Sequence, residues 1–187
     1  MNTGRLFART AVGGLFVAHG TQKLFGWFGG PGLEGASETM ESLELRPGRR
    51  NALTAALTET VGGTLLILGA FTPVAAAALS GAMFTAIRKV SFSKGFFNTG
   101  GGYEFNLTLI AALAALVDGG PGSPSVDSAL GIDETGPAWA LAAIAAGAAG
   151  STLAVEAGKR LEQEEPSGSG RFERERAPDA EAAGTPG

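Results

Sequence analysis

Five long apolar runs follow one another along the chain, and within each of them apolar residues occupy every face of a helix. A surface helix of a water-soluble protein would instead carry polar side chains along one side. The pattern therefore predicts an all-α protein whose helices form a transmembrane bundle. The predicted helices cover residues 6–28, 52–71, 74–90, 104–117 and 137–157.

The lengths of these runs fall into two groups. A helix that spans a bilayer needs about 20 predominantly apolar residues. The first, second and fifth runs reach that length, whereas the third and fourth are shorter. Aromatic residues that flank the short runs, among them Phe92 and Tyr103, extend them toward the interface between lipid and water. An alanine-rich, water-soluble helical bundle is the alternative that the same pattern allows.

The first run is preceded by basic residues, as the core of a signal peptide is. Arg5 stands before the run and Arg9 near its start, but no small-x-small cleavage site follows, and apolar sequence continues past His19. We therefore expect a retained first helix.

Basic residues between the runs set the expected orientation in the cell membrane. Lys and Arg occur between the first and second runs and between the third and fourth, whereas the loop before the fifth carries only acidic charges. Five spans then place the N-terminus outside and the C-terminal tail in the cytoplasm. Arg5 and Arg9 favour the opposite direction, and a four-span protein with a peripheral fifth helix would change the side of the N-terminus.

The amino-acid composition changes at the C-terminal end of the chain. Residues 159–187 are charged, rich in Pro, Gly and Ala, and almost without large apolar side chains. Such a segment cannot bury enough surface to offset the entropy lost on ordering, so it is predicted to be a disordered tail. The net charge of −4 therefore averages a charged tail with a far more apolar remainder.

The residue types that are missing exclude several kinds of chemistry. The chain has no cysteine, which excludes disulfides, thiolate metal sites and iron–sulfur clusters. His19 is the single histidine, so a site with several histidine ligands would need a second chain. We expect no metal site. No basic stripe with interleaved aromatic residues supports nucleic-acid binding.

Ionisable groups inside apolar runs are the strongest candidates for a functional site, because each costs free energy in a membrane. Glu59 lies deepest, about two turns into the second run, and the small residues Gly62 and Gly63 share its face. Small residues let another helix approach and supply a partner; Gly69 is a third packing candidate. Glu59 is either a proton-carrying or ligand-binding carboxylate, or part of a structural pair that fixes helix register.

Three polar residues near the end of the first run lie on one face of the helix. His19, Gln22 and Lys23 have the i, i+3, i+4 spacing of neighbours. They either line a pocket, with a positive charge opposite an acidic residue, or serve separate structural roles. In the second case Lys23 reaches the lipid headgroups and His19 makes a polar contact in the core.

The fourth run begins with a further pair of candidates. Glu104 is in its first turn, where the helix dipole stabilises a carboxylate, and Asn106 can form a hydrogen bond between helices. The preceding glycine triplet lacks the spacing of a nucleotide-binding loop. Asp127 is expected to cap the helix that follows it. The predicted polar pocket consists of His19, Gln22, Lys23, Glu59, Glu104 and Asn106.

The order of several short motifs resembles that of the DoxX family of small bacterial membrane proteins. The motifs are "HGTQKLFGWFGG", "LRPG", "ETVGGTLLILGAFTP", "AMFTA", "KGFFNTGGGYE" and "GPGSPSVD". The resemblance extends over residues 5–132. It implies a four-helix transmembrane bundle in residues 1–132, to which a fifth transmembrane helix at 137–157 and the tail are additions.

The resemblance also implies which positions are functional. One position departs from the family's pattern, since relatives often have a histidine where Ser91 stands. A metal or haem site built from that histidine and His19 therefore fails for this chain. The positions that match the family's motifs are His19, Gly20, Lys23, Glu59, Gly62, Gly63, Gly95, Gly102, Glu104 and Asp127.

For function, the resemblance implies a subunit associated with quinone, redox or oxidative-stress complexes of the membrane. We expect no covalently bound cofactor, a quinone as the candidate ligand, and no catalysis by the protein on its own. The expected partners are the lipid bilayer together with redox-complex subunits or further copies of the chain as a homo-oligomer. The alternative function is a non-catalytic membrane scaffold or small-molecule carrier.

Overall fold

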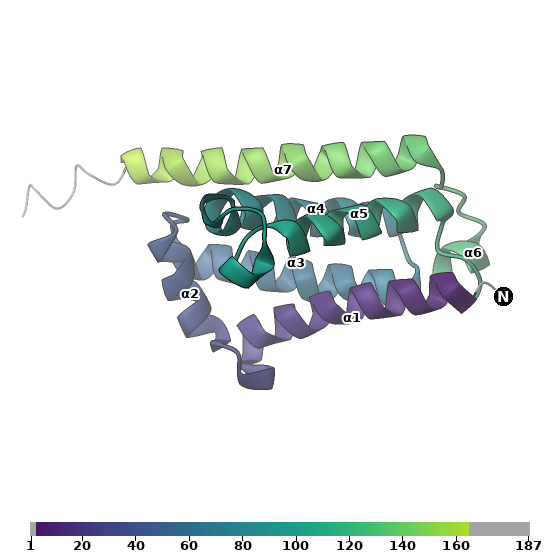
Figure 1. The fold of residues 1–187 in the computed structure, drawn as a ribbon, viewed down its shortest axis with the longest axis horizontal. Coiled ribbons are helices and arrows are strands. Elements are labelled where there is room, and N and C mark those ends of the chain that lie inside the picture. The colour runs from purple at the N-terminus through teal and green to yellow at the C-terminus, as the bar shows by residue number, and fades with distance from the viewer. Residues whose placement is uncertain (1–2, 165–187) are drawn as a thin grey trace, which may run out of the picture.

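The computed structural model describes residues 3–164, and every regular element in this range is a helix. Four long helices pack side by side, and a fifth, α7, lies along α4 and α5 (Figure 1). The all-α class predicted from the sequence is confirmed. The long helices are α1 (Thr3–Phe25), α3 (Gly48–Leu68), α4 (Thr72–Ala86), α5 (Glu104–Gly119) and α7 (Pro137–Glu164).

Shorter elements close the two ends of the bundle. At one end, α2 packs against α3, and at the other, α6 lies beside the start of α1 (Figure 1). The chain continues α4 through a π-helical turn, η2, before it reaches α5. The short elements are η1 (Trp27–Gly29), α2 (Gly32–Ser42), η2 (Ile87–Ser91), η3 (Phe92–Lys94), η4 (Asn98–Gly100) and α6 (Val126–Leu130).

The helix ends differ from the predicted ends for identifiable reasons. α1 ends at Phe25 rather than residue 28, because Gly26 takes a left-handed conformation with a φ of 71°. α3 ends at Leu68 for the same reason, since Gly69 has a φ of 61°. Glycine adopts this conformation without a steric penalty and commonly terminates helices.

The last helix is longer than predicted. α7 continues to Glu164, so its final turns include the beginning of the segment that we expected to be disordered. The rest of that predicted tail lies outside the described residues.

Close packing of α3 against its neighbours depends on small residues. A Cβ atom on Gly63 would lie 2.6 Å from the carbonyl oxygen of Gly13 in α1, and one on Gly62 would lie 3.0 Å from Leu79 in α4. Both glycines therefore stand at helix contacts. Gly69, predicted as a third packing residue, instead follows the end of α3, where a Cβ would meet Arg9 and Ser125.

The outer surface of the bundle carries many large apolar side chains. Two described helices are long and apolar enough to cross a membrane: Gly48–Leu68 and Pro137–Gly158. They correspond to the predicted spans at 52–71 and 137–157. Among the other described helices, α4 and α5 are shorter, with 15 and 16 residues. α1 has 23 residues but is not apolar enough. Exposed apolar side chains include Phe7, Leu15, Leu57, Val61, Leu68, Leu141 and Leu153.

Candidate functional site

A buried ion pair joins α1 to α3. Glu59 is 5% exposed, and Lys23 Nζ, from the last turn of α1, donates a hydrogen bond to its Oε2 atom. A carboxylate in an apolar interior needs such a partner, because its desolvation is otherwise costly. Lys23 was predicted either to pair with an acidic residue or to reach the lipid headgroups. In the structure it pairs with Glu59.

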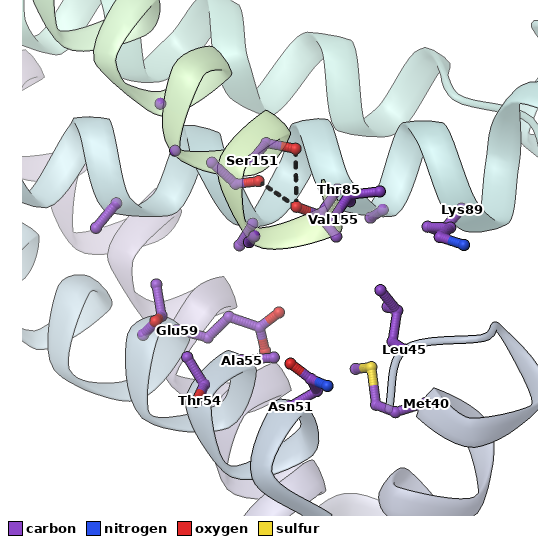
Figure 2. Close-up of a pocket in the computed structure, with 18 of the residues that line it drawn as sticks. Met40, Leu45, Asn51, Thr54, Ala55, Glu59, Thr85, Lys89, Ser151 and Val155 are labelled. Atoms are coloured by element: carbon purple, nitrogen blue, oxygen red, sulfur yellow. Dashed lines mark hydrogen bonds between the residues drawn. The ribbon is translucent and has the colours of Figure 1, made fainter. Parts of the chain in front are cut away.

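A cavity of about 610 Å³ lies beside this pair (Figure 2). Both Lys23 and Glu59 line it, and the carboxylate of Glu59 extends from α3 toward the opposite wall, which carries Thr85 and Ser151. This volume falls in the range of pockets that bind small molecules.

The walls of the cavity are mainly apolar. α2 and the segment after it close one end with Met40, Leu43 and Leu45. α3 contributes a few polar side chains, Asn51, Thr54 and Thr58. The opposite wall consists largely of small residues from α4 and α7: Ala77, Ala78, Gly81, Ala82, Ala146, Gly147, Gly150 and Ala154. An apolar lining with a few fixed polar groups is typical of sites for small organic ligands.

A second lysine lies near the end closed by α2. Lys89, in the π-helical turn, lines the cavity, and its Nζ atom lies 3.7 Å from Oε2 of Glu44. The Glu44 side chain is 76% exposed, so solvent screens this pair. It joins the end of α4 to the segment after α2.

The structure separates the remaining residues of the predicted pocket. His19 is exposed and Gln22 half-buried, and neither lines the cavity. Glu104 accepts a hydrogen bond of 2.7 Å from the backbone N–H of Asn98, which closes the loop before α5. Asn106 donates to the sulfur of Met83 at 3.4 Å, between α5 and α4. Of the six predicted residues, Lys23 and Glu59 share the site.

The described side chains, up to residue 158, contain no cluster of potential metal ligands. Among them, no three His, Asp or Glu side chains gather as metal ligands would. The site offers instead a carboxylate, an ammonium group and apolar surface, which suit a neutral organic molecule with a polar end.

Comparison with known proteins gives one match. Residues 4–93, from α1 to η3, match the DoxX family model. Residues 4–93 therefore form a DoxX domain, which supports assignment of the chain to the DoxX family. No curated protein and no solved structure matches it. The family and the two apolar helices together indicate a membrane protein.

The DoxX segment, residues 4–93, holds both members of the ion pair and four of the five α-helices that line the cavity, α1, α2, α3 and α4. The match ends before "NTGGGYE" and Asp127, so it is shorter than the resemblance over residues 5–132. α5, α6 and α7 lie outside it, although α7 supplies part of the cavity wall.

A second polar cluster links the DoxX segment to the chain that follows it. Asp127 is 2% exposed and accepts hydrogen bonds from the backbone N–H groups of Phe71, at 2.7 Å, and Thr72, at 3.0 Å. The Thr72 hydroxyl donates a third, at 2.7 Å. Asp127 therefore caps the start of α4, and our expectation that it caps its own helix was wrong. Ser125 does so, accepting from the N–H of Ser128 at 3.2 Å.

Arg9 completes this cluster and was missed as a structural residue. It is 4% exposed, and its guanidinium donates to the carbonyl oxygens of Pro121, at 2.9 Å, and Pro124. The sequence carried the relevant signal, since Arg9 stands inside an apolar run. Arg9 was interpreted as a signal-peptide or orientation feature and not as a buried group.

Proposed function

We propose that this DoxX protein is a multi-pass membrane protein that binds a quinone in the cavity beside Lys23 and Glu59. It acts as a subunit of a membrane redox complex, without a covalently bound cofactor. The observation that carries the proposal is the position of the charged pair at the edge of an apolar cavity of ligand size. The catalytic chemistry then belongs to the partner subunits.

The proposed membrane arrangement has five spans, α1, α3, α4, α5 and α7. α4 is short, but helical backbone continues through η2, so the segment from Thr72 to Ser91 is about 30 Å long. That length matches the hydrocarbon thickness of a bilayer. The distribution of Lys and Arg between the spans supports an orientation with the N-terminus outside the cell and the end of α7 in the cytoplasm.

The chemistry of the pair favours a ligand with carbonyl oxygens. A lysine ammonium has three N–H donors, and Glu59 accepts one of them. The others are available to an acceptor in the cavity. A quinone has carbonyl acceptors on a flat ring, and these suit the ion pair. Its apolar tail suits the small-residue wall.

The test is quinone binding by the full chain in detergent, measured by calorimetric titration. Glu59→Gln removes the charge that holds Lys23, so we expect quinone affinity to fall about tenfold or more. Glu104→Gln is the matched control, because Glu104 does not line the cavity. It should leave the affinity within about twofold of the wild type. Equal affinity in all three proteins, or no binding by the wild type, would contradict the proposal.

A second function, a non-catalytic scaffold, is favoured by one specific observation. The Lys23–Glu59 pair connects two helices, α1 and α3, and so contributes to their register. If the protein is a scaffold, Glu59→Gln lowers its thermal stability in detergent and leaves ligand binding unchanged.

A further inference from the structure

α7 has an unexplained role, because it lies outside the DoxX segment and yet lines the cavity. Six of its residues line the cavity: Ala146, Gly147, Gly150, Ser151, Ala154 and Val155. All except Val155 are small, so they leave space where larger side chains would fill it. The space beside the ion pair is therefore shaped partly by a helix that the family match does not include.

The contact between α7 and α4 holds this wall in place. A Cβ atom on Gly147 would lie 2.7 Å from the carbonyl oxygen of Ala77, so the two backbones are in close contact. The hydroxyls of Thr85 and Ser151 form a hydrogen bond of 2.9 Å across the same interface (Figure 2). Arg88 donates a further hydrogen bond, of 3.1 Å, to Thr152. These contacts anchor α7 to the helical segment 72–91 over residues 147–152.

Gly150 differs from Gly147 in its surroundings. A Cβ atom on Gly150 would meet no atom within 4 Å, although this residue lines the cavity. The missing side chain at Gly150 therefore corresponds to open space rather than to a helix contact.

The two sides of the cavity differ in polarity. The charged pair comes from α1 and α3, whereas the wall formed by α4 and α7 is composed mainly of alanine and glycine. A ligand whose polar ring lies at the pair would direct its apolar portion along this small-residue wall.

We propose that α7 forms a tail subsite, which holds the apolar tail of the quinone while the ring lies at Lys23 and Glu59. This inference rests on the proposed function and adds to it the placement of the ligand. It makes α7 the element that selects between tailed and tail-less ligands.

The first experiment compares two glycine substitutions in the full chain. Gly150→Leu fills the subsite, and Gly14→Leu is the matched control, because a Cβ at Gly14 also meets no atom within 4 Å and Gly14 does not line the cavity. The probes are a benzoquinone with a decyl tail and the same ring without it. We expect Gly150→Leu to weaken binding of the tailed quinone about tenfold and to leave the tail-less one within about twofold. Gly14→Leu should change neither.

The second experiment locates the tail directly. Because the chain has no cysteine, Ala154→Cys introduces a unique thiol in the cavity wall, and Ala149→Cys introduces one on the same helix outside the cavity. The tailed quinone should slow alkylation of the Ala154→Cys variant several-fold, and the tail-less ring should not. Neither quinone should protect the Ala149→Cys variant.

The outcomes separate the two proposals. If the wild type binds the tailed quinone but Gly150→Leu binds it equally well and the Ala154→Cys variant is unprotected, the tail subsite is wrong and the proposed function stands. If Gly150→Leu weakens both quinones alike, the substitution acts on the whole site, and the subsite is again wrong. If the wild type binds neither quinone, the proposed function fails and the subsite with it.

Discussion

The two ends of the bundle each contain buried charged groups, but the protein surrounds them differently. At the end near α6, both carboxylate oxygens of Asp127 accept hydrogen bonds from the start of α4. Arg9 donates hydrogen bonds to carbonyl oxygens of the loop between α5 and α6. At the other end, Glu59 is bound by Lys23, and a cavity lies beside the pair. Burial of a charge therefore does not by itself identify a binding site. The space next to the charge makes the difference.

The largest effect should follow from breaking the Asp127 cluster. Asp127→Ala removes three hydrogen bonds from the start of α4 and leaves Arg9 without a nearby carboxylate, so we expect the free energy of unfolding to fall by about 3 kcal/mol. Thermal unfolding in detergent measures the loss, with Asp133→Ala, at an exposed position, as the control. Quinone affinity of the folded fraction should not change. A loss no larger than that of Asp133→Ala would show that the cap is dispensable.

An intermediate effect is expected at the Lys23–Glu59 end. Lys23→Met alone leaves the buried carboxylate unpaired and should destabilise the protein by about 2 kcal/mol. The double variant Lys23→Met, Glu59→Met replaces both charges by apolar groups and should regain most of that stability. The unfolding temperatures of the wild type, the single variant and the double variant test this expected order of stability.

The double variant also sharpens the comparison between function and scaffold. Its quinone binding should stay lost although its stability returns, because the ligand's polar partners are absent. A double variant that binds quinone as the wild type does would remove Lys23 and Glu59 from the site.

The smallest effect is expected at the Lys89–Glu44 pair, near the end of the cavity that α2 closes. Glu44→Gln breaks the ion pair with Lys89, and since Glu44 is largely exposed, we expect a change of about 0.5 kcal/mol or less in the free energy of unfolding. The same unfolding measurement, repeated at high and low salt, checks it. A loss comparable to that of Lys23→Met would mean that this pair, too, is shielded from solvent.

Much of the architecture could be predicted from the sequence, because it follows from local patterns. The continuous apolar runs located the five long helices, and small residues beside Glu59 predicted the close contacts at Gly62 and Gly63. The helix ends were less accurate, since Gly26 and Gly69 end their helices through left-handed conformations that the apolar pattern does not record.

The candidate site was predicted in part, for a physical reason. The i, i+3, i+4 spacing places His19 and Lys23 on one helix face, but it does not determine what that face meets. Only Lys23 reaches Glu59, because the partner of a side chain depends on how helices far apart in sequence pack. The cavity itself was not predictable, because it depends on alanine and glycine positions of α4 and α7 that together form a wall opposite α3.

The cap on α4 has a consequence for how this protein can be divided. Asp127 lies beyond residue 93, where the DoxX match ends, yet it holds the first turn of a helix within that match. A fragment cut at the family boundary would expose the amides of Phe71 and Thr72 without their acceptor. The boundary drawn by sequence similarity is therefore not a boundary between independently folding units.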